Sequence, residues 1–149
     1  MITLDKLNIL AGLKLAGANI HEDQIEIVDW GCPHKTKILP NGKMAVYLFF
    51  LGNDCLKIGK VGPNSNARYN SQHYNPKDSK SNLANSILSD NSFPEKINDN
   101  EIGNWIKNNI QRINVLIDEN VGIFALNFIE AYLQLVFKPK YEGFKTQNN

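Results

Sequence analysis

Hydrophobic and polar positions along the chain predict a β-hairpin near its middle. The run from Met44 to Leu51 consists of eight apolar residues, and the turn sequence Gly52-Asn53-Asp54 separates it from a second apolar stretch, Leu56 to Val61. Two such stretches on either side of a short turn are typical of two paired strands. Eight residues are far fewer than the about 20 that a membrane-spanning helix needs. We therefore expect a buried strand and no membrane partner.

Two more segments have strand patterns. Residues 24–30 contain several β-branched residues and precede a chain break at Gly31-Cys32-Pro33-His34, which indicates a strand of undecided type. Between Arg112 and Ile117 the apolar residues alternate with polar ones, which predicts a strand with one buried face. Because the type of the segment 24–30 is undecided, the predicted sheet has about three main strands, with 112–117 as the third.

Apolar residues at helical spacing predict five helices around this sheet. Thr3 is the expected N-cap of the first, Ser81 that of a short helix ending at Leu88, and Asn98 or Asp99 that of the helix carrying Trp105. The expected segments are 4–15, a helix through Arg68 and His73 that ends before Pro76, 82–88, a helix around 100–106, and 122–137. Helices flanking a small sheet define an α/β fold of the α+β type.

The length of 149 residues, 42% of them hydrophobic, fits one domain with its own core. We expect residues 1–43 to form an N-terminal extension packed on the same domain. Residues 44–143 form the core, and residues 144–149 form a disordered tail.

Charge and cysteine content narrow the function classes. Sixteen Lys and Arg against 15 Asp and Glu give a net charge of +1, so any nucleic-acid binding must come from a local patch. The two cysteines and the absence of a secretion signal predict a reducing, cytoplasmic location. A zinc site built from Cys32, His34, His21 and Cys55 fits no common finger spacing. No phosphate-binding glycine loop or serine-nucleophile elbow occurs.

Three charged positions stand out from the apolar patterns. Glu130 lies in the middle of the stripe Ile123, Leu126, Leu133 and Phe137 on the last predicted helix. It is either a glutamate at the stripe edge paired with a lysine or a metal ligand. In the hairpin, Lys57 shares a face with Gly59, and Lys60 precedes a Gly-Pro-Asn-Ser loop, where a lysine is either a solvated edge residue or a phosphate contact.

Taken together, these positions resemble the GIY-YIG nuclease family. The chain reads Ala45-Val46-Tyr47, then Lys57-Ile58-Gly59, then Arg68, and finally Glu130. In that family a hairpin carries the two tripeptides, a following helix supplies an arginine, and a later helix supplies a metal-binding glutamate. Ala45 replaces the first motif glycine and Lys57 replaces the second motif tyrosine. Some restriction endonucleases of the family similarly carry lysine there.

The resemblance implies a central three-stranded, mostly antiparallel sheet and a metal-dependent endonuclease acting on DNA. Tyr47 would be the general base, Arg68 and Lys57 would stabilise the phosphate and the transition state, and Glu130 would bind Mg²⁺ or Mn²⁺. His73 is a reserve base, or else a polar helix residue. An enzyme should bring Tyr47, Lys57, Arg68 and Glu130 around one open cleft.

The segment from Arg68 to Asn75 mixes positive charge, aromatic rings and amides, a composition suited to DNA contact. Equally, its aromatic residues are typical of packing against a sheet. The candidate nucleic-acid contacts are Lys60, Asn64, Tyr69, Gln72 and Tyr74. A homodimer or larger complex would offer a way to cut two strands. The alternative function is an inactive module that binds nucleic acid or protein, with Lys57 as the sign of lost chemistry.

Overall fold

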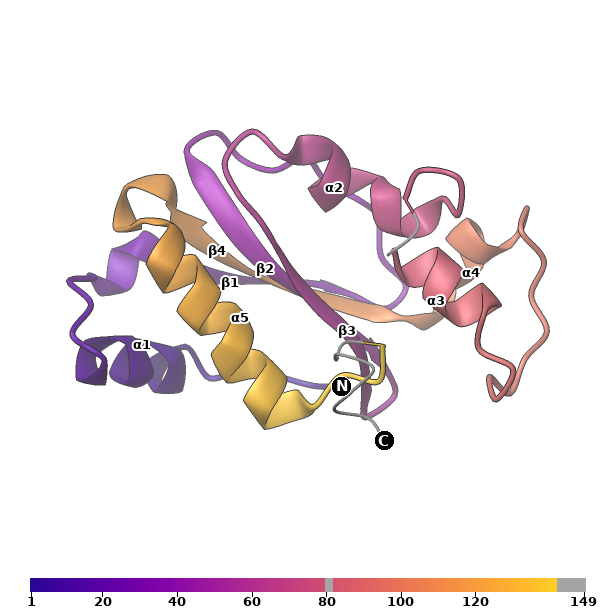
Figure 1. The fold of residues 1–149 in the computed structure, drawn as a ribbon, viewed down its shortest axis with the longest axis horizontal. Helices are drawn as coiled ribbons and strands as arrows, with labels where there is room; N and C mark the ends of the chain where they lie inside the picture. Colours follow the sequence, from indigo (N-terminus) through magenta and orange to yellow (C-terminus); the bar gives the residue numbers. More distant parts are fainter. Residues whose placement is uncertain (80–81, 142–149) are drawn as a thin grey trace.

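The computed structural model describes residues 1–79 and 82–141, and it shows an α+β fold built on a four-stranded antiparallel sheet (Figure 1). The strand order is β1-β4-β2-β3. The strands are β1 (Ile25–Gly31), β2 (Lys43–Leu51), β3 (Asp54–Val61) and β4 (Gln111–Asp118). The predicted hairpin is confirmed as β2 and β3, and the predicted late strand as β4.

The expectation of three strands is wrong, because β1 joins the same sheet. It pairs antiparallel with β4, from Ile25 opposite Ile117 to Gly31 opposite Arg112. Residues 25–31 therefore form an edge strand, and the N-terminal residues complete the sheet rather than only packing on it. Of the predicted tail, residues 144–149 lie outside the described part of the chain.

Helices cover both faces of the sheet, so side chains of β2 enter two separate cores (Figure 1). Met44, Val46 and Leu48 pack under α1 (Lys6–Leu15) and α5 (Ile123–Phe137). Ala45, Tyr47 and Phe49 pack under the helices of the opposite face, which are α2 (Asn66–Asn70), α3 (Leu83–Leu88) and α4 (Ile102–Asn109). Short 3-10 turns are η1 (Glu22–Gln24), η2 (Gln72–Tyr74) and η3 (Glu119–Val121).

Local hydrogen bonds correct several predicted helix ends. Asp5, not Thr3, caps α1, because its carboxylate accepts a hydrogen bond from the Leu7 N–H. Asn82 caps α3 by accepting from the Asn85 N–H, and the expected cap Ser81 lies outside the described residues. At α4, the side chain of Asn98 accepts from backbone N–H groups in the turn that precedes the helix.

The single helix expected through Arg68 and His73 is broken in two. Ser71 adopts φ −129° and ψ −32°, outside the helical region, and its hydroxyl donates to the carbonyl of Ala67. The chain therefore ends α2 at Asn70 and continues as η2. This break turns Asn70 and His73 toward different parts of the molecule.

The structure contains no helix long and apolar enough to cross a membrane within the residues it describes. Neither cysteine forms a disulfide bond within the described residues: Cys32 is exposed, and Cys55 is buried in the core beneath α5.

We expect Leu126→Ala to lower the free energy of unfolding by about 2–5 kcal/mol, because Leu126 is fully buried between α5 and the sheet. Phe124→Ala on the same helix should change it by less than about 0.5 kcal/mol, because Phe124 is 85% exposed. Urea denaturation of the two variants and the unaltered protein measures both changes in the free energy of unfolding. Equal losses would show that α5 does not pack on the sheet in this way.

Candidate functional site

A groove at the edge of the sheet brings together three of the charged residues singled out from the sequence. Lys60 comes from β3, Arg68 from α2 and Glu130 from α5, and all three line one cavity of about 290 Å³. The Lys60 Nζ atom lies 3.3 Å from the Glu130 Oε1 atom. Both side chains keep contact with solvent, at 38% and 21% exposure, and Arg68 is exposed.

Strand alternation and the following turn explain how this groove forms. Ile58 packs in the core beneath α5, so Lys60, two positions on, points to the same face of β3. On α5 the buried residues Leu126 and Leu133 lie on either side of Glu130 and hold it above that strand. After β3, Asn64 adopts a left-handed φ of 63°, and the chain reverses there into α2, which carries Arg68. The lysine-paired interpretation of Glu130 is confirmed.

Tyr47 lies on the opposite face of the sheet, fully buried. Its ring crosses the edge strand at Gly59, its register partner, and a methyl group at Gly59 would lie 2.2 Å from the Tyr47 hydroxyl oxygen. Only glycine fits at this close approach. The contact with the Tyr47 ring thus explains why position 59 is a glycine.

Lys57 shares the Tyr47 face, as its register with Phe49 requires, but it is only 5% exposed. The expectation of one open cleft around Tyr47, Lys57, Arg68 and Glu130 is therefore wrong for this structure. Arg68 and Glu130 line the groove, whereas Tyr47 and Lys57 are buried on the other face. The edge strand β3 separates the two pairs.

His73 lies against Tyr47, with the two ring centroids 4.4 Å apart. Its Nδ1 atom accepts a hydrogen bond from the Leu83 N–H, which leaves the proton of the neutral ring on Nε2. Burial, with the cations of Arg112, Lys57 and Arg68 nearby, holds the pKa of His73 well below its usual range. The ring is therefore neutral at physiological pH and, at 2% exposure, shielded from solvent.

Arg112 is a buried cation next to the candidate residues, and the sequence analysis did not identify it. It is fully buried, its Nη1 atom donates to the Tyr74 hydroxyl at 3.0 Å, and its Nε atom donates to Asn114 at 3.0 Å. Its Cζ atom lies 4.0 Å from the centroid of the Trp30 ring and 5.6 Å from that of Tyr47. The signal available was the alternation of Arg112 and Asn114 opposite the apolar face of β4, which reads as a solvated face.

The Arg112 contact continues into a chain of hydrogen bonds. The Tyr74 hydroxyl donates to the Nε2 atom of His34 at 2.8 Å, and His34 Nδ1 donates to the carbonyl of Ile110 at 2.8 Å, which fixes the neutral tautomer. Burial lowers the pKa of His34 to about 4, and the cations of Arg112 and Lys107 act in the same direction. Burial also raises the pKa of Tyr74.

The residues expected to contact DNA divide into surface and core positions. Lys60 lines the groove, Asn64 is exposed on the loop after β3, and Gln72 is half-buried. Tyr69 and Tyr74 are 2% and 7% exposed and pack around Arg112, so base stacking on the ring of Tyr69 is ruled out in this structure. The packing interpretation of these two tyrosines is the one the structure supports.

Glu130 is the carboxylate of the groove. No cluster of three or more His, Cys, Asp or Glu side chains that could share a metal ion is found within residues 1–79 and 82–141. Comparisons of the chain with protein-family models, with curated proteins and with solved structures find no match.

The His34 contacts predict a pH dependence of stability. The unfolded chain takes up a proton on this imidazole near pH 6.5, whereas the folded protein does so only near pH 4. Falling pH therefore favours unfolding across this window, by up to about 1.4 kcal/mol per pH unit. We expect His34→Gln, which keeps a donor and an acceptor, to reduce the loss of unfolding free energy between pH 6.5 and 4.5. Urea denaturation at several pH values measures the unfolding free energy of both proteins. Parallel plots of unfolding free energy against pH would contradict the prediction.

Proposed function

We propose that the chain is a metal-dependent endonuclease that hydrolyses phosphodiester bonds in DNA. The observation that carries this proposal is the convergence of Lys60, Arg68 and Glu130 in one solvent-accessible groove at the sheet edge. Two cations beside one carboxylate suit phosphodiester hydrolysis, because negative charge develops both on the phosphorus centre and on the departing oxygen.

Each groove residue has a distinct role in this proposal. Arg68 holds phosphate oxygens through its planar guanidinium, and its exposure leaves it accessible to a DNA backbone. Lys60, on a flexible stem, leaves Glu130 and binds the same phosphate when substrate enters.

The donor set fits a magnesium ion bound through one carboxylate. Mg²⁺ keeps several of its waters and commonly uses one or two protein carboxylates together with substrate phosphates, so Glu130 is sufficient as the protein ligand. Bound there, Mg²⁺ or Mn²⁺ would neutralise charge on the departing 3′ oxygen. The Lys60 contact holds the Glu130 carboxylate over the groove beforehand.

Tyr47 is our candidate general base, supported by the cations on its face of the sheet. Lys57 shares that face and the Arg112 guanidinium lies 5.6 Å from the Tyr47 ring centroid, so both would stabilise negative charge on the phenol oxygen. Because Tyr47 is buried, this role requires that DNA binding expose its hydroxyl at the sheet edge beside Gly59, where the phenol ring crosses β3. His73, whose ring lies tilted against that of Tyr47, would remain the reserve base beside it.

One observation favours a second function, a binding module without catalysis. The Tyr47 ring is fully buried and Lys57 nearly so, as expected of residues that only support the fold. In that case Arg68 and Lys60 would bind the DNA backbone, and Glu130 would serve only as the ion-pair partner of Lys60.

Cleavage of supercoiled plasmid in the presence of Mg²⁺ or Mn²⁺ tests the proposal. We expect Glu130→Gln and Arg68→Ala each to lower the cleavage rate by at least about 100-fold, because each removes a group that stabilises the transition state. Tyr47→Phe should do the same if the phenol is the base, while its buried shape keeps the fold.

Glu119→Gln is the matched control, because Glu119 is an exposed glutamate on η3 outside the groove. Its cleavage rate should equal that of the unaltered protein. Intact plasmid with every metal tested, together with DNA binding that Arg68→Ala weakens, would instead establish the binding module.

A further inference from the structure

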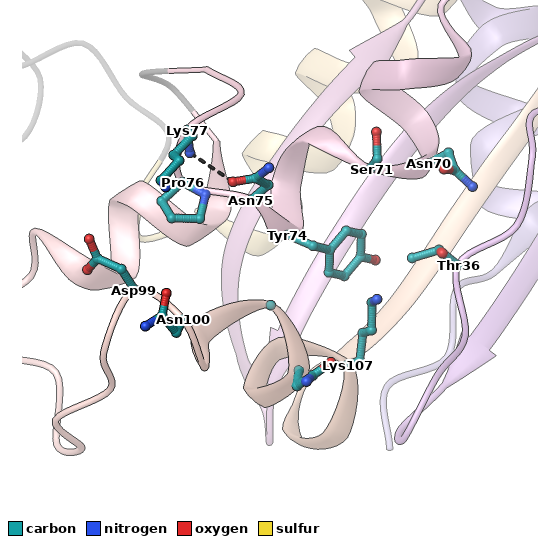
Figure 2. A pocket seen from close by; sticks show the side chains of 12 residues that line it. Thr36, Asn70, Ser71, Tyr74, Asn75, Pro76, Lys77, Asp99, Asn100 and Lys107 are labelled. Atoms are coloured by element: carbon teal, nitrogen blue, oxygen red, sulfur yellow. Dashed lines mark hydrogen bonds between the residues drawn. The ribbon is translucent and has the colours of Figure 1, made fainter.

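A second cavity, of about 480 Å³, lies between η2 and α4 (Figure 2). Asn70 and Ser71 at the end of α2 form one wall, and Gly103 and Lys107 of α4 lie on the opposite side. The volume is within the usual range of about 300–1,000 Å³ for cavities that bind small organic groups. The cavity is separate from the groove that contains Glu130, with which it shares no lining residue.

The walls of this cavity are held in place by close packing. A methyl group at Gly103 would lie 2.6 Å from the carbonyl oxygen of Tyr74, so the glycine lets α4 approach η2 closely. Tyr74, which lies in the cavity wall, is fixed by its hydroxyl contacts with His34 and Arg112. The cavity is therefore formed before any ligand arrives.

The cavity lining combines positive charge with asparagine side chains that are open to solvent. The side-chain amides of Asn70, Asn100 and Asn104 make no hydrogen bond with any other residue that the structure describes. Lys107 holds its ammonium group 5.5 Å from the centroid of the Tyr74 ring, and Lys77 lies across the cavity from it (Figure 2). Asp99 is the single acidic residue of the lining.

We propose that this cavity binds one nucleotide extruded from the base stack of the DNA substrate. The inference rests on the proposed function and adds a substrate class: DNA with an unpaired or displaced nucleotide. An asparagine amide offers a donor and an acceptor together, which can pair with the edge of a nucleobase. The lysine ammonium groups can pair with the phosphates of the same nucleotide. A base that stays paired in a duplex cannot enter a cavity of this kind.

The position of α2 links the cavity to the groove. This helix carries Arg68 at the groove and Asn70 at the cavity, and its five residues span only about 7.5 Å. One DNA strand held by Arg68 therefore extends to the cavity within a few nucleotides. A base extruded beside the bound phosphate would be read by the amides.

Binding without cleavage tests the inference independently of catalysis. The full chain carrying Glu130→Gln is titrated in EDTA with two labelled duplexes, one fully paired and one with a single-nucleotide bulge, and fluorescence anisotropy is recorded. We expect the bulged duplex to bind at least 10-fold more tightly. Asn104→Ala and Lys107→Ala should each reduce this preference to about 3-fold or less.

Matched controls are Asn108→Ala, on α4 but outside the cavity lining, and Lys96→Ala, in the loop before α4. Both should keep the full preference. Equal affinity for the two duplexes, no binding of either, or equal effects of cavity and control substitutions would each overturn the inference. If the unaltered protein still cleaves plasmid in any of these cases, the proposed nuclease function survives. Preferential bulge binding by a protein that cleaves nothing would instead uphold the cavity and overturn the nuclease.

Discussion

The buried guanidinium of Arg112 is the constraint on which the arrangement of this molecule depends. A fully buried charge is costly unless other groups compensate it, and no carboxylate pairs with Arg112 in the part of the chain that the structure describes. The compensation comes from aromatic faces, nearest that of Trp30 at 4.0 Å, and from the oxygens of Tyr74 and Asn114. One face of the sheet is therefore packed with aromatic and polar side chains, while the core under α5 is built mainly of apolar side chains.

This polar core fixes the surroundings of Tyr74 and of Tyr47. It holds Tyr74 in place, and through it the 3-10 turn that forms one wall of the amide-lined cavity. It also sets a cation beside Tyr47, on the far side of β3 from Glu130. The groove and the cavity thus lie at opposite ends of α2, whose Tyr69 packs against Arg112. Any rearrangement that exposes Tyr47 must leave this cluster intact or bear the cost of uncovering it.

Sequence reasoning recovered the features that local patterns encode. The hairpin, β4 and α5 follow from runs and periodicity, and the anomaly of Glu130 within an apolar stripe led to the groove residue. Long-range pairings were beyond it: β1 joins β4 across more than 80 residues of chain, and Tyr74 meets Arg112 across 38. For the same reason the sequence left the aromatic residues near Arg68 open between DNA contact and packing, because Arg112, which they surround, is distant from them along the chain.

The central claim is that phosphate binds in the groove formed by Lys60, Arg68 and Glu130. A crystal structure of the Glu130→Gln protein with an uncleaved DNA oligonucleotide tests it most directly. The account predicts one backbone phosphate within hydrogen-bond distance of the Arg68 guanidinium and the Lys60 ammonium, beside the side chain at position 130. DNA bound across another surface, with no phosphate at Arg68, would contradict it.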